Sequence, residues 1–176
     1  MSYTELKVAE LNGFVETYQE YRDAWGGLAY IWNSIWNKYL KKGDLDTWLI
    51  EKNHKRLWDA VKDEKIPGWI RLIHASTFDY IIVEYNKLPI ISRYYKKFVE
   101  TFPPPPAGCH LIEWSEDCMK IYNEYNSNNC AGICFYGTSI VEDIWEDYNL
   151  SKSDKHRFLF EEYSEKLGLN DEMDQR

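Results

Sequence analysis

The sequence predicts an α+β fold: a single helix-rich domain of about six helices with a small antiparallel sheet of two or three strands. Several segments have apolar residues at helical spacing, whereas two short segments are rich in β-branched and aromatic residues. A chain of 176 residues is long enough to bury one hydrophobic core without a disulfide or a metal ion. We therefore expect one domain over residues 1–176, with residues 170–176 frayed.

A long N-terminal helix is the strongest periodic prediction. Its large apolar residues recur at alternating spacings of three and four, at Leu11, Phe14, Tyr18, Tyr21, Trp25, Leu28, Trp32, Ile35 and Tyr39. Gly26-Gly27 lies midway along this segment, where each glycine costs roughly 1 kcal/mol relative to alanine. The pair indicates either a close approach by another element or a break in the helix, and we favour the close approach.

Further elements are expected before and within a run of four prolines. They are a helix from Asp44 or Asp46 to Lys62, a short helix opened by Pro67, a strand over residues 78–85, a helix over residues 88–102 and a stiff connector at residues 103–106. Aspartate is a favoured N-cap, and proline fits the first turn of a helix but stops one that has already formed. The strand is expected because its residues are mostly β-branched or aromatic.

The remaining elements follow the connector. They are a helix over residues 111–125, a turn at residues 126–129, a strand over residues 131–136 and an amphipathic helix from Ser151 or Ser153 to Leu167. The two predicted strands flank the proline run and are expected to pair with each other.

Composition and charge exclude several classes of function. The net charge of −8 argues against direct binding to nucleic acid, which needs clustered Lys and Arg. No apolar run approaches the length of a membrane span, and the first residues lack the basic and apolar regions of a signal peptide. We therefore expect a cytoplasmic protein without a membrane segment.

The four cysteines are expected to be buried thiols. Cys109, Cys118, Cys130 and Cys134 do not form the closely spaced pairs with which zinc sites usually begin. Disulfides are unusual in the cytoplasm, and free cysteine is among the most buried residue types. We expect no bound metal and no cofactor.

Two clusters contain residue types that are used in catalysis. His74, Ser76 and Asp79 occur where a helix meets a strand, and Thr138 and Ser139 follow the second strand. Neither the nucleophile elbow of the hydrolases nor a phosphate-binding loop is present. We expect His74 to lie at the edge of the core and Ser76 to terminate a helix. No residue is assigned a catalytic role, and the candidates for a hydrolase or small-molecule site are His74, Ser76, Asp79, Thr138 and Ser139.

The negative charge is concentrated near the C-terminus, where residues 142–176 contain eleven acidic and five basic residues. We interpret the carboxylates there as a face that binds another protein: Glu142, Asp143, Glu146, Asp147, Glu161 and Glu162. The preferred function is a non-enzymatic protein-binding module, such as an inhibitor of the phage or mobile-element type. The alternatives are the small-molecule-binding protein or hydrolase above, and a homodimeric assembly protein that associates through the N-terminal helix.

Overall fold

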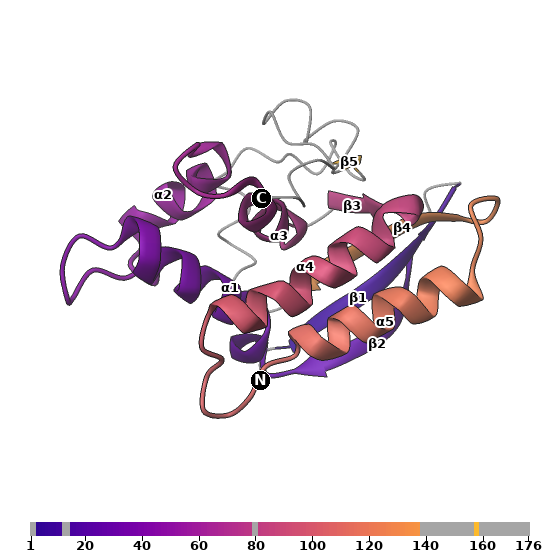
Figure 1. The fold of residues 1–176 in the computed structure, drawn as a ribbon, viewed down its shortest axis with the longest axis horizontal. Helices are drawn as coiled ribbons and strands as arrows, with labels where there is room; N and C mark the ends of the chain where they lie inside the picture. The colour runs from indigo at the N-terminus through magenta and orange to yellow at the C-terminus, as the bar shows by residue number, and fades with distance from the viewer. Residues whose placement is uncertain (1–2, 12–14, 79–80, 138–156, 159–176) are drawn as a thin grey trace.

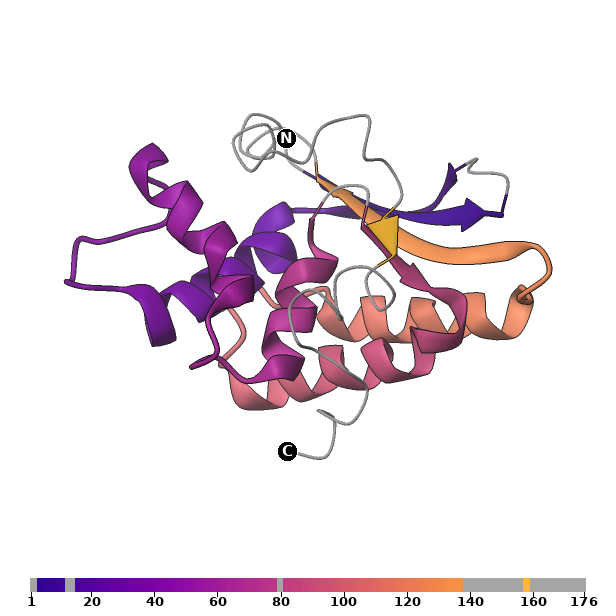
Figure 2. The same cartoon turned by 90° about the horizontal axis from the view of Figure 1, so that it is seen from above.

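A sheet covered by two long helices forms one end of the molecule, and shorter helices form the other end (Figure 1). The computed structural model describes residues 3–11, 15–78, 81–137 and 157–158. Within these residues the chain has five α-helices and an antiparallel sheet of order β2-β1-β4-β3, so the predicted α+β class is confirmed. Helices α4 and α5 cover one face of the sheet as a second layer (Figure 2).

The antiparallel sheet is built from the N-terminus and from the two predicted strands. Its strands are β1 (Tyr3–Glu10), β2 (Val15–Arg22), β3 (Ile81–Glu84) and β4 (Cys130–Gly137). Along β1 the side chains of Thr4, Leu6 and Val8 are buried and alternate with the partly exposed side chains of Glu5 and Lys7. This alternation is typical of a strand with one face on the core. The expected pairing of β3 with β4 is confirmed.

The predicted N-terminal helix is wrong over residues 15–22, where the chain forms β2 instead, paired with β1. Leu6 pairs with Gln19 and Lys7 with Thr17, so Tyr18 is an extra residue in β2. A bulge of this kind changes which face the following side chains take. Tyr18 and Tyr21 therefore both pack on the core although they are three residues apart, a spacing that resembles a helix. The dipeptide Asn12-Gly13 between the strands was the overlooked signal, since it is typical of hairpins.

Helical structure in this region begins only at the glycine pair. The 3₁₀ turn η1 (Ala24–Gly26) is followed by α1 (Leu28–Ile35) and by one π-helical turn, η2 (Trp36–Leu40). Both interpretations of Gly26-Gly27 apply: the predicted helix is broken, because α1 starts after the pair, and another element approaches the pair closely. The backbone N–H of His110 donates to the carbonyl of Gly26 at 2.7 Å, and the Trp114 ring lies against Gly27.

The second end of the molecule has a core rich in tryptophan. Here α2 (His54–Asp59) lies between the short turns η3 (Glu51–Asn53) and η4 (Ala60–Lys62), and α3 (Gly68–Ser76) follows Pro67. The predicted helix from Asp44 or Asp46 starts later than expected, because residues 41–50 form a loop. The ring of Trp32 makes edge-to-face contacts with Trp48 and Trp58, at centroid distances of 5.3 and 5.1 Å. Such contacts add to the stability gained by burying the rings.

The two long helices have the bounds that the sequence predicts, to within one residue. They are α4 (Leu88–Thr101), which follows the turn η5 (Tyr85–Lys87), and α5 (Leu111–Glu124). Ser92 and Ser115 each donate to the backbone carbonyl of the other, which lets the two helices approach closely. Trp114 stacks on Phe135 of β4 at 4.2 Å and joins α5 to the sheet.

Two predictions for the C-terminal part concern residues that are mostly outside the described ranges. Arg157–Phe158 form a short strand, β5, parallel to β3, so the predicted helix is wrong at these two residues. The rest of that helix and the frayed residues 170–176 lie outside the described residues. None of the helices in the described ranges is long and apolar enough to cross a bilayer.

Candidate functional site

His74, the base of the predicted catalytic cluster, is buried in the tryptophan-rich core. Its ring stacks on Trp58 and meets Phe78 edge to face. Its Nε2 lies 2.7 Å from the carbonyl oxygen of Leu57. Burial lowers the pKa of His74 to about 4, and the bond to Leu57 opposes this only in part. The imidazole is therefore neutral at pH 7 and donates Nε2–H to that carbonyl.

Ser76 is equally buried and has its hydrogen bonds within the protein. Its hydroxyl donates to the carbonyl of Ile73 at 2.6 Å and lies 2.9 Å from the hydroxyl of Tyr95. With exposed fractions of 1% and 0%, His74 and Ser76 have the environment of core residues. Asp79, Thr138 and Ser139 lie outside the described residues.

The predicted acidic face is also outside the described ranges. It consists of Glu142, Asp143, Glu146, Asp147, Glu161 and Glu162. Among the described residues, no three His, Cys, Asp or Glu side chains are grouped so that they could hold a metal ion. Three of the four cysteines are buried, and Cys109 is half-buried.

A pocket that the sequence analysis missed lies between α1–η2 and the proline connector. Its volume is about 560 Å³, within the usual range for small-molecule sites. The apolar wall is formed by Trp25, Tyr30, Phe102, Pro103 and Pro105. The hydroxyl of Tyr30 donates to the carbonyl of Phe102 at 2.7 Å, which fixes the start of the connector against α1. We call this space the α1 pocket.

The polar wall of the α1 pocket comes from one face of α1 and η2. Asn33, Ser34, Asn37 and Lys38 line it, at positions i, i+1, i+4 and i+5. Residues at this spacing share one side of a helix. This polar stripe in an otherwise apolar segment was the sequence signal for the site. The stripe becomes one wall of a pocket only when it faces the proline connector, which is more than 60 residues further along the chain.

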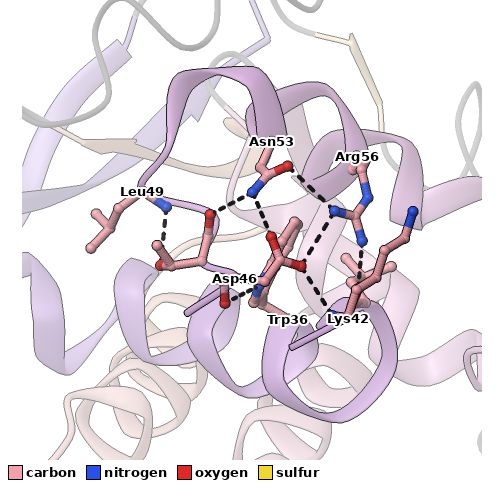
Figure 3. A network of polar contacts seen from close by, with 8 residues as sticks. Trp36, Lys42, Asp46, Leu49, Asn53 and Arg56 are labelled. Carbon is pink, nitrogen blue, oxygen red and sulfur yellow. Dashed lines mark hydrogen bonds and ion pairs between the residues drawn. The ribbon is translucent and has the colours of Figure 1, made fainter. Parts of the chain in front are cut away.

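A loop that projects from the molecule begins directly after η2, and we call residues 41–53 the projecting loop (Figures 1 and 2). Asp46 holds it together: its carboxylate accepts from the backbone N–H of Lys42 at 3.0 Å and from the Asn53 side chain at 2.8 Å. Arg56 reaches the same carboxylate at 3.4 Å and also donates to the carbonyl of Leu40 (Figure 3). The bond to Lys42 is the main cause of the lowered pKa of Asp46.

Aromatic contacts add to this network. The Arg56 guanidinium lies 4.6 Å from the ring centre of Trp36, whose Nε1–H donates to the carbonyl of Asp46 at 3.1 Å. Both ends of the projecting loop are thus tied to the helices from which it leaves. The projecting loop has a defined conformation although only its last three residues, those of η3, are helical.

The projecting loop exposes aliphatic side chains. Leu45 is 92% exposed, Leu49 is 49% exposed and Ile50 is 40% exposed. Leu49 points away from the hydrogen-bond network in Figure 3. Trp48 of the same loop donates to the side-chain oxygen of Asn33 and contacts Trp25 at 6.3 Å. Because Asn33 and Trp25 line the α1 pocket, the projecting loop and the pocket belong to one region of the surface.

Comparison of the chain with family models, with curated proteins and with solved structures finds no significant match.

Proposed function

We propose that this protein is a non-enzymatic module that binds another protein through the projecting loop. The observation that supports this most strongly is the exposure of Leu45, Leu49 and Ile50 within six residues of an ordered loop. Single exposed aliphatic residues are common on protein surfaces, but three on one projecting segment are typical of an interaction surface.

The ordering of the loop favours binding. A segment that is already fixed loses little conformational entropy when it docks, so more of the contact energy appears as affinity. Four partners of Asp46 provide this fixation: Trp36 in η2, Lys42 and Asn53 at the two ends of the loop, and Arg56 in α2.

The charge around the loop indicates what kind of partner it fits. Residues 38–62 contain seven Lys and Arg and four Asp and Glu, although the whole chain contains 21 and 29. Lys41, Lys42 and Lys52 are exposed beside the aliphatic side chains. The matching surface is an apolar patch with an acidic rim, because opposite charges at the rim steer association.

A capture experiment with matched variants tests the proposal. The full chain is immobilised, and proteins retained from an extract of its native cells are quantified for the wild type, the double variant Leu45→Asp/Leu49→Asp and Ile112→Asp. Ile112 is a suitable control because it is 38% exposed on α5. We expect one stoichiometric partner with the wild type and the control, and about tenfold less with the double variant. The retained protein is then purified and titrated against all three forms.

A second arm separates the projecting loop from the predicted acidic face. In this variant Glu142, Asp143, Glu146 and Asp147 are changed to Lys. Loss of the partner with this variant, but not with the double variant, would assign binding to the acidic residues. No stoichiometric partner for the wild type would overturn the protein-binding function itself. Light scattering on the wild type tests the homodimer, for which the structure no longer offers a continuous helical seam.

A further inference from the structure

We infer that the α1 pocket is a site for a small carboxylate with a planar aromatic body. The inference is independent of the protein-binding function, since it concerns the pocket and not the aliphatic side chains of the loop.

The volume and the apolar wall of the pocket indicate the size and the aromatic character of the ligand. About 560 Å³ accommodates a bicyclic aromatic molecule. Trp25, which is 40% exposed, and Phe102 provide flat aromatic surfaces, and Pro103 and Pro105 extend the wall. Aromatic rings gain from offset stacking or edge-to-face contact beyond the area they bury, so these walls favour a planar ring over a flexible chain.

The polar wall sets the charge of the ligand. The ammonium group of Lys38 lies 5.7 Å from the ring centre of Phe102, at the apolar wall. Within the described part of the chain, Lys38 forms no ion pair, and no acidic side chain lines the pocket. The Lys38 ammonium group beside the apolar wall is therefore matched by a ligand with an apolar body and one anionic group.

The amides of the polar wall also suit a carboxylate. Because the side-chain oxygen of Asn33 accepts from Trp48, its amide NH₂ remains as a donor. Asn37 is exposed and adds a second amide to the same wall. A carboxylate accepts from such donors and from the ammonium group at the same time, which a neutral ligand of equal size does not.

The two walls are held in place before any ligand binds. The bond from Tyr30 to the carbonyl of Phe102 fixes the connector, and the bond from Trp48 to Asn33 fixes the polar wall. Asn37 and Lys38 are on the π-helical turn η2. Such turns are rare and occur often at functional sites. A site that is formed in advance keeps more of the contact energy as affinity.

Calorimetric titration of the full chain with 2-naphthoate and with its neutral counterpart, 2-naphthamide, tests the inference. The variants are Lys38→Gln and, as a matched control, Lys96→Gln, which removes an exposed lysine of α4 that does not line the pocket. We expect 2-naphthoate to bind the wild type and Lys96→Gln with the same affinity, and Lys38→Gln about tenfold more weakly. We also expect 2-naphthamide to bind the wild type about tenfold more weakly than the acid and to be insensitive to Lys38→Gln.

Three results would overturn the inference: no binding of 2-naphthoate to the wild type, equal binding of the acid and the amide, or equal weakening by both lysine variants. Trp25→Ala, checked for folding by its melting temperature, provides a second test and is expected to weaken the acid and the amide alike. The double variant Leu45→Asp/Leu49→Asp is expected to bind 2-naphthoate normally, so failure of the pocket and failure of the projecting loop give different patterns.

Discussion

Gly27 lies so close to Trp114 that a Cβ atom on residue 27 would be 2.5 Å from Cζ2 of the indole ring. Trp114 is fully buried, meets Tyr95 edge to face and stacks on Phe135. The start of α1 is therefore packed onto α5 at a residue that has no side chain.

The first prediction follows from this contact. Gly27→Ala forces Trp114 or the start of α1 to shift, and we expect the free energy of unfolding to fall by roughly 1–3 kcal/mol. Urea denaturation measures it. Gly43→Ala is the control, because a Cβ atom there meets nothing within 4 Å, and its effect should stay within about 0.5 kcal/mol. Equal effects of the two variants would show that the contact with Trp114 is not tight.

Gly132 in β4 combines a close contact with an unusual backbone conformation. Its φ is +155°, and a Cβ atom would lie 2.0 Å from the carbonyl oxygen of Val83 in β3. Gly132→Ala should therefore destabilise the protein by about 3 kcal/mol, the sum of backbone strain and steric displacement of β3. Gly108→Ala separates these causes, because Gly108 has a φ of +93° with open space around it. We expect it to cost about 1 kcal/mol, and a cost as large as that of Gly132→Ala would contradict the assigned role of the Val83 contact.

His74 should make the stability depend on pH below neutrality. Its pKa is about 4 in the folded protein and about 6.5 in the unfolded chain, so the unfolded chain takes up the proton first as pH falls. Its contribution to stability is complete above pH 6.5 and is lost progressively between pH 6.5 and pH 4, by up to about 1.4 kcal/mol per pH unit. Urea denaturation from pH 7.5 to pH 4 measures the slope.

The matched variant for this measurement is His74→Gln, whose amide retains a donor for the carbonyl of Leu57 but does not titrate. The difference in unfolding free energy between wild type and variant should shrink as pH falls. A difference that is independent of pH would mean that His74 is not held neutral by its burial.

The hydrogen bonds of Asp46 should keep the projecting loop ordered. Asp46→Ala removes the acceptor for the Lys42 N–H, for Asn53 and for Arg56. We expect hydrogen exchange of the Lys42 amide to become about tenfold faster or more, and the free energy of unfolding to fall. Asp44→Ala changes an exposed aspartate of the same loop and should alter neither quantity. Unchanged exchange at Lys42 in Asp46→Ala would contradict the assigned role of the carboxylate.

Helices α4 and α5 and strands β3 and β4 could be predicted because local signals delimit each of them. Pro89 lies in the first turn of α4, the four prolines from Pro103 stop its continuation, and asparagines separate α5 from β4. Local preference and tertiary environment agree in these elements.

The N-terminal hairpin could not be predicted from spacing alone. The bulge at Tyr18 places residues three apart on one face of a strand, and the same spacing describes a helix. The α1 pocket depends on tertiary structure in a further way. Its polar stripe is visible in the sequence, but its apolar wall comes from Phe102 and the prolines, and only the folded chain brings these together.

The position of β1 between β2 and β4 has a consequence for biosynthesis. Strand β1 leaves the ribosome long before its second partner, β4, which ends at Gly137. Protein synthesis proceeds at about 5–20 residues per second, so this edge of β1 stays unpaired for on the order of ten seconds. The outward side chains of Glu5 and Lys7 are charges of the kind that discourage edge-to-edge aggregation during such an interval. Closing the sheet is therefore a late and long-range event.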